Sequence, residues 1–195
     1  MPSIQARAVS IGVAELQNYP LSAHPSHPPL GVRNIEARVI GFDANWLRLR
    51  WRIEGSGRLV VPPFAGKGRA DGLWETTCFE AFLRPDGGES YVELNLSSSE
   101  RWAAYDFSCY REGMAERPFP REPQCTTRVG TDLTIFDAAV PSAGLPSLPA
   151  ALGLTAVIEE EGGVKSYWAM AHPPEKPDFH DASCFAGVLE PPAAP

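Results

Sequence analysis

The chain has 195 residues, of which 24 are acidic and 17 basic, so its formal net charge is −7 at neutral pH. A chain of this length most often folds as one domain, and it can bury a core large enough to need no disulfide or metal. The acidic balance argues against nucleic acid or an anionic membrane as partner, because both select basic surfaces. We therefore expect a single domain over 1–195.

The N-terminal residues 1–26 contain no basic cluster followed by an apolar run, and no segment is long and apolar enough to cross a membrane. The sequence therefore predicts a cytoplasmic protein without a secretory signal, unless the true start lies further upstream. The chain has four cysteines, Cys78, Cys109, Cys125 and Cys184. They form no C-x-x-C pair, which argues against zinc and predicts buried free thiols in a cytoplasmic chain.

Short alternating segments follow one another along the chain, separated by 20 prolines and 17 glycines. Such frequent prolines and glycines favour short strands over long helices. The clearest early strand is 46–53, in which Leu47, Leu49, Trp51 and Ile53 share one face and three arginines share the other. The predicted strands are 35–42, 46–53, 58–61, 78–83, 90–96, one that opens at Trp102, 126–130, 133–140, 154–160 and 164–171.

In the predicted strand 78–83, alternation places Glu80 on the same face as Cys78 and Phe82. A carboxylate among apolar neighbours must be paired or used, because burying an unpaired charge is costly. A salt bridge to Arg101, or to an arginine of the earlier strand, would satisfy it structurally. Ligand hydroxyls would satisfy it functionally, and the two interpretations are compatible.

The next predicted strand continues this polar face with Glu93 and Asn95, which point away from its apolar residues. Trp74 lies just before the first of these strands, and Trp102 opens the third. Carboxylate, amide and indole groups on one sheet face suit polyhydroxylated ligands, since rings stack on apolar sugar faces and acceptors take hydroxyl protons.

A proline-rich segment near the C-terminus, 172–180, concentrates potential metal ligands, among them His172, Asp178 and His180. The spacing is not that of a helical zinc site, and the prolines impose an extended path. We expect a structural loop that is pinned by hydrogen bonds of Asp178 and His180.

Three motifs extend these patterns: LWExxCFExF from Leu73, YxExN from Tyr91 and RWxxYxF from Arg101. On these motifs the chain resembles DOMON-like domains over about residues 35–190, and more specifically it is similar to carbohydrate-binding modules of family 9. The resemblance implies an all-β fold, an antiparallel β-sandwich of immunoglobulin-like or jelly-roll type.

The resemblance also implies a ligand site. Trp74 and Trp168 would clamp a sugar ring, Glu80 would accept hydrogen bonds from its hydroxyls, and Arg101 would donate to them. Asn95 is added from its place on the polar face. Together these residues predict non-catalytic binding of a small carbohydrate or polyol, without a cofactor.

Other interpretations stay open. Core packing of Trp168 is as well supported by the sequence as stacking, and a structural or protein-interaction module without a sugar ligand would place Trp74 and Trp168 apart or in the core. A glycan-active enzyme would use Glu80 and Glu93 as a carboxylate pair, about 5–10 Å apart. Acidic loops could bind calcium, although no EF-hand pattern is present.

Overall fold

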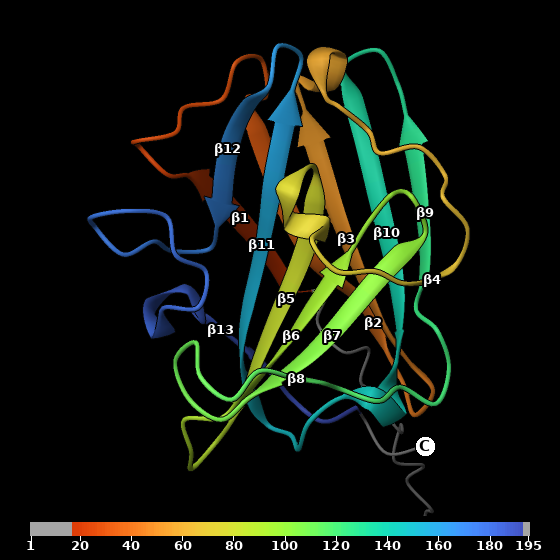
Figure 1. The fold of residues 1–195 in the computed structure, drawn as a ribbon, viewed down its shortest axis with the longest axis vertical. Coiled ribbons are helices and arrows are strands. Elements are labelled where there is room, and N and C mark those ends of the chain that lie inside the picture. The colour runs from red at the N-terminus through yellow and green to blue at the C-terminus, as the bar shows by residue number, and fades with distance from the viewer. Residues whose placement is uncertain (1–16, 193–195) are drawn as a thin grey trace, which may run out of the picture.

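The computed structural model describes residues 17–192. They form two β-sheets that lie face to face, with β1 (Gln17–Ala23) running from one sheet into the other (Figure 1). In β1, Leu21 pairs with Ile35 of the back sheet, and Ser22 pairs with Ala169 of the front sheet. The predicted all-β sandwich is confirmed. Its two layers are continuous, because β1 pairs with a strand of each.

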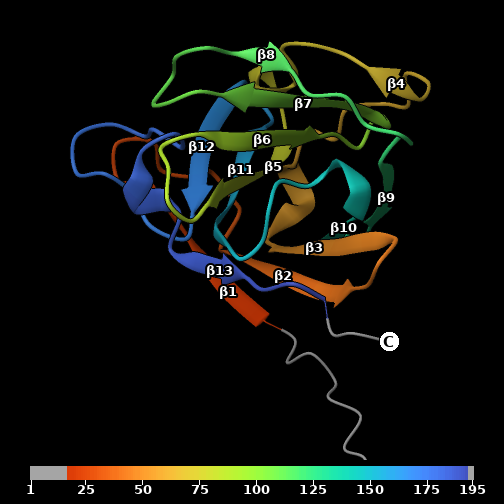
Figure 2. The same ribbon diagram turned by 90° about the horizontal axis from the view of Figure 1, so that it is seen from below.

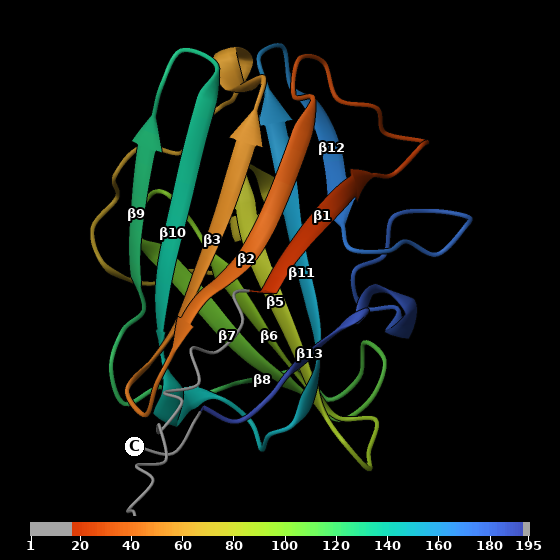
Figure 3. The same ribbon diagram turned by 180° about the vertical axis from the view of Figure 1, so that it is seen from behind.

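The front sheet contains, from edge to edge, β4 (Gly68–Arg69), β7 (Arg101–Phe107), β6 (Tyr91–Leu96), β5 (Cys78–Pro85), β11 (Ala150–Glu160) and β12 (Val164–Ala169). Two short strands, β8 (Ala115–Glu116) and β13 (Gly187–Leu189), pair with β7 and β11. The back sheet continues from β1 to β2 (Asn34–Phe42), β3 (Trp46–Glu54), β10 (Leu133–Pro141) and β9 (Gln124–Val129) (Figure 3). The 3₁₀ turns are η1 (Ser56–Arg58), η2 (Leu73–Glu75), η3 (Ser142–Gly144) and η4 (Ala182–Cys184).

Two details of the predicted strands differ from the structure. The pair of β4 and β7 is parallel, whereas the other neighbouring strands in the described part of the chain are antiparallel. The predicted strand 58–61 is wrong, because Ser56–Arg58 is a 3₁₀ turn and Leu59 makes a single bridge to Glu160. The left-handed backbone of Gly55 (φ 81°) turns the chain out of β3 at this point.

The main core fills the space between the two layers, which Figure 2 shows end-on. As predicted, alternate residues of β3 are buried, and its arginines point outward. Trp51 of β3 packs against Phe79 of β5 and Phe136 of β10, with ring centroids 5.4 and 5.9 Å away. These rings join the two sheets at the centre of the sandwich.

The outer face of the front sheet carries a second hydrophobic cluster, formed by Phe82, Tyr91, Ala103, Tyr105, Phe107, Val157, Ala169, Phe179, Cys184 and Phe185. Phe179 and Phe185 come from the segment after β12, which lies at the β12 side of the front sheet (Figure 1). An outer sheet face is usually exposed in a sandwich, but here chain segments cover part of it. Polar residues on these strands are therefore buried as well.

The four cysteines are free, as predicted, although Cys109 is only half-buried. Within residues 17–192, no helix is long and apolar enough to span a membrane.

A buried carboxylate closes one end of the sandwich. Glu160, at the end of β11, is fully buried and accepts hydrogen bonds from the backbone N–H groups of Leu30, Gly31 and Val32, at 2.6, 2.7 and 3.1 Å. These bonds fix the segment between β1 and β2 against the front sheet. They also satisfy three amides that no strand pairs.

We expect Glu160→Ala to lower the free energy of unfolding by about 3 kcal/mol, because it leaves three partly buried amides without an acceptor. Urea unfolding followed by tryptophan fluorescence measures the change. Glu161→Ala is the matched control, since Glu161 is exposed and pairs with Arg58 at 3.3 Å. Equal effects of the two substitutions would contradict the role given to Glu160.

Candidate functional site

A cavity of about 370 Å³ opens on the covered outer face of the front sheet. Its floor comes from the strands: Glu80, Phe82, Glu93, Phe107, Val157 and Tyr167. Its walls come from η2 and from two later segments: Trp74, Arg111, Met114, Pro177, Asp178, Phe179 and His180. The cavity therefore brings together side chains from distant parts of the chain.

Strand register explains the composition of the floor. Phe82 of β5 pairs with Glu93 of β6, and Val157 of β11 pairs with Tyr167 of β12. Paired residues project to the same side of a sheet, so the alternation predicted for β5 and β6 directs Glu80 and Glu93 to one face.

Glu80 is a buried carboxyl group without a cationic partner. It is 3% exposed, and its Oε2 accepts a hydrogen bond from the Thr155 hydroxyl at 2.9 Å. Burial, together with the nearby Glu93, raises the pKa of Glu80 to about 8. At neutral pH its carboxyl is therefore mostly protonated and can donate as well as accept.

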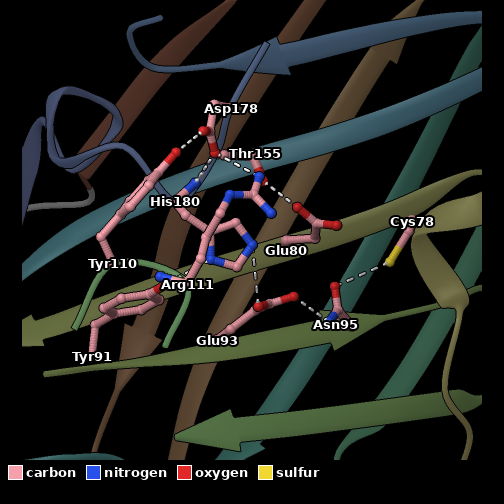
Figure 4. A network of polar contacts seen from close by, with 10 residues as sticks. All are labelled: Cys78, Glu80, Tyr91, Glu93, Asn95, Tyr110, Arg111, Thr155, Asp178 and His180. Atoms are coloured by element: carbon pink, nitrogen blue, oxygen red, sulfur yellow. Dashed lines mark hydrogen bonds and ion pairs between the residues drawn. The ribbon is translucent and has the colours of Figure 1, made fainter. Parts of the chain in front are cut away.

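Glu93 lies beside it and is 6% exposed. Burial raises the pKa of Glu93, although a hydrogen bond from the Asn95 amide, at 2.6 Å, and the charge of Arg111 oppose the increase. Asn95 in turn accepts a contact from the Cys78 thiol at 3.8 Å. Glu93 thus lies between Asn95 and His180, and Asn95 holds it from the side (Figure 4).

His180 forms the next part of the network. Its Nδ1 lies 2.7 Å from the hydroxyl of Tyr91, and its Nε2 lies 3.7 Å from Oε2 of Glu93. Burial and the charge of Arg111 lower the pKa of His180 to about 4, so the ring is neutral at pH 7 and forms no ion pair with Glu93. A hydrogen on Nε2 fits both neighbours, because Nδ1 then accepts from Tyr91.

Asp178 ties the two wall segments together. It accepts hydrogen bonds from Arg111 at 2.7 Å, from the Tyr110 hydroxyl, and from the backbone N–H of His180 at 3.2 Å. Burial alone would raise the pKa of Asp178, but the bonds from Arg111 and Tyr110 outweigh it and hold that pKa below its usual value. The prediction that hydrogen bonds of Asp178 and His180 pin this loop is confirmed.

Arg111 has a left-handed backbone, with φ 56°. Non-glycine residues rarely adopt this conformation, and it persists where surrounding contacts fix it. Here the N–H of Arg111 donates to the Tyr91 hydroxyl at 3.2 Å while its guanidinium holds Asp178.

The structure brings together only some of the predicted site residues. Trp74 and Glu80 line the cavity, and Trp74 is 41% exposed at its wall. Asn95 is buried on the same sheet face, opposite Glu80 in the strand register, but is not part of the lining and acts through Glu93. Arg101 lies outside the lining, at the start of β7, where its guanidinium donates to the carbonyl of Ala65 at 2.7 Å.

Trp168 does not form the expected clamp with Trp74. It is 4% exposed, belongs to the main core, and its indole N–H donates to the Ser166 hydroxyl at 2.9 Å. Its neighbour Tyr167 faces the cavity instead, because adjacent strand residues point to opposite faces. A structural module without a sugar ligand would explain the core position of Trp168. It would not explain why Trp74 is exposed at the cavity wall.

Tyr167, Arg111, Asp178 and His180 were absent from the predicted ligand set. Alternation along β12 would predict that Tyr167 faces the cavity, but only once it is known that Trp168 faces the core. The ligand-rich composition of 172–180 marked Asp178 and His180, but not their contact with the front sheet. In residues 17–192 no group of three or more histidine, cysteine or acidic side chains is arranged to hold a metal ion.

Glu80→Gln should remove a pH-dependent loss of stability. In the wild type this carboxyl stays protonated in the folded state while it ionises in the unfolded chain. Its contribution to the free energy of unfolding is therefore fully present below pH 4.5 and decreases as pH rises to about 8. The stability of Glu80→Gln relative to wild type should therefore increase across this range by on the order of 4 kcal/mol. Urea unfolding at a series of pH values measures it. Glu161→Gln, at an exposed site, should follow the wild type, and a parallel curve for Glu80→Gln would contradict the assignment.

No protein-family model matches the chain, and no curated protein matches its sequence. Among solved structures, it is similar to a Bacteroides uniformis ATCC 8492 protein to which a carbohydrate-binding role is attributed. The TM-score is 0.62 at 15% identity, over 90% of this chain and 86% of that one. It is also similar to a carbohydrate-binding module of family 9 from Caldicellulosiruptor kristjanssonii in complex with glucose. That TM-score is 0.50 at 12% identity, over 100% and 93% of the two chains. At these identities the comparisons establish the architecture: the chain shares the β-sandwich fold of family 9 carbohydrate-binding modules.

Proposed function

We propose that this protein binds a small carbohydrate or polyol, without catalysis, in the cavity over Glu80. The observation that carries the proposal is a cavity that places an exposed indole, Trp74, beside buried carboxyl groups with hydrogen-bonding capacity. Its volume, about 370 Å³, falls in the range typical of small-molecule sites. The similarity in fold to sugar-binding modules supports the same assignment.

In this proposal the ligand contacts differ from those expected from the sequence. Trp74 stacks on the apolar face of the sugar, and Tyr167 replaces Trp168 as the second aromatic group. Arg111 replaces Arg101 as the cationic donor of the wall. Protonated Glu80 donates to one hydroxyl, and Glu93 accepts from another.

Such a site should bind weakly. Each sugar hydroxyl exchanges hydrogen bonds with water for hydrogen bonds with protein, so the net gain for each is small. One exposed indole and a few polar contacts are consistent with micromolar to millimolar dissociation constants, about 4–8 kcal/mol of binding free energy.

We expect at least one member of a panel of mono- and disaccharides to raise the melting temperature, because a ligand that binds only the folded state stabilises it by mass action. Trp74→Ala should weaken binding of that sugar about tenfold or more, since it removes the stacking surface. Isothermal titration calorimetry gives the dissociation constants, and calcium and EDTA arms test for a metal.

The matched control is Trp46→Ala, which removes a tryptophan of the back sheet that packs under Arg121 at 4.5 Å and is absent from the cavity lining. It should leave sugar binding unchanged. Failure of every mono- and disaccharide to bind the folded wild-type protein would reject the proposed function and favour an interaction module without a sugar ligand.

One observation favours a glycan-active enzyme as the second candidate: Glu80 and Glu93 line the same cavity. A pKa near 8 also suits Glu80 to act as a general acid. Release of nitrophenol from aryl glycosides tests this alternative. Turnover that is lost in both Glu80→Gln and Glu93→Gln would support it, whereas sugar binding without turnover would support binding alone.

A further inference from the structure

The cavity lining contains more carboxyl groups than cationic side chains. It has three carboxyl groups, Glu80, Glu93 and Asp178, but one guanidinium, that of Arg111. Arg111 is committed to Asp178 at 2.7 Å. Among the described residues, no arginine or lysine lies within ion-pairing distance of Glu80 or Glu93, and His180, 3.7 Å from Glu93, is neutral at pH 7. Two adjacent buried carboxyl groups therefore lack a cation.

Glu80 also has an oxygen without a protein partner. Its Oε2 accepts from Thr155 (Figure 4). No residue in the described part of the chain donates a hydrogen bond to Oε1. The side chain is 3% exposed and lines the cavity, so this oxygen is accessible only from there. This oxygen therefore faces the cavity with its hydrogen-bonding capacity unused by the described residues, and a donor on a ligand could bond to it.

Aromatic rings accompany these carboxyl groups. Trp74, Phe82, Tyr167 and Phe179 all contribute to the lining. The face of an aromatic ring attracts a cation, and most strongly so when the cation is shielded from water. Carboxylates together with ring faces are the combination that recognises an ammonium group.

The alternatives fit less well. A neutral sugar can exchange hydrogen bonds with both carboxyl groups, but unlike an ammonium group it adds no charge attraction to them. An anionic ligand would face three carboxyl groups with a single guanidinium already paired. We propose that the cavity binds a polyhydroxylated amine, such as an amino sugar, whose ammonium group lies against Glu80 and Glu93. This inference rests on the proposed function and specifies the class of its ligand.

Binding then has a defined proton balance. The ammonium keeps its protons, and Glu80 releases its own to the solvent as it becomes a carboxylate. The titratable groups around it are Cys78 on β5, Tyr91 and Glu93 on β6, and Arg111, Asp178 and His180 on the wall segments (Figure 4). Arg111 and Asp178 stay charged throughout and His180 stays neutral, so the proton released on binding comes from Glu80.

The test compares glucosamine and galactosamine with glucose and galactose by calorimetry on the full chain at about pH 6.5, where Glu80 is protonated. We expect the better amino sugar to bind at least about tenfold more tightly than its hydroxyl counterpart, or about 1.4 kcal/mol. Repeating the titration in phosphate and in MES, which differ in ionisation enthalpy and are not polyhydroxylated amines, should show release of about one proton.

Glu80→Gln should reduce the preference for the amine to within about twofold while it preserves the folded state, since Gln is the neutral isostere of a protonated Glu. Its melting temperature reports on folding. Glu161→Gln, at an exposed site outside the cavity, should keep the full preference.

The outcomes separate the two proposals. Binding of glucose or galactose with equal or higher affinity than the amino sugars would overturn this inference and leave the proposed function in place. A preference for the amine that persists in Glu80→Gln would also overturn it. If no sugar of either kind binds, both proposals fail together.

Discussion

The site depends on the burial of two carboxyl groups on a sheet face that a sandwich normally leaves to solvent. Glu80 and Glu93 occupy neighbouring strands, and register brings them to the same side. Left in water, they would be ordinary surface acids with ordinary pKa values. Covering segments remove that water, and the resulting desolvation raises the pKa of both.

Hydrogen bonds of Asp178, together with the apolar contacts of Phe179 and Phe185, hold the segments that cover this face. Arg111 and Tyr110 come from the segment after β7, His180 comes from the segment after β12, and all three bond to Asp178. Tyr91 adds a second connection from the sheet, through the N–H of Arg111 and the ring of His180. Because the network joins both wall segments to a strand, it fixes the shape of the cavity.

The sequence predicts much of the sheet and only part of the site. Alternation identifies β3, β5 and β6 and places Glu80 and Glu93 on one face, because a two-residue period is a local property. Alternation does not show which face of β12 points to the core. The sequence therefore predicts Trp168 at the ligand site, whereas the structure has Tyr167 there and Trp168 in the core. Arg111 has no local signal at all, since its contact with Asp178 spans 67 positions along the chain.

A buried acidic pair also bears on the choice between a binding site and a structural module. Structure alone would favour apolar residues at these two positions, because apolar side chains would pack with Phe82 and Val157 at no cost in desolvation. Glu160 is a buried carboxyl group with a structural role, and it accepts hydrogen bonds from three backbone amides. Glu80 receives one hydroxyl and keeps its other oxygen toward a cavity. This contrast is what the proposed ligand site predicts, because a ligand would then supply the second partner of Glu80.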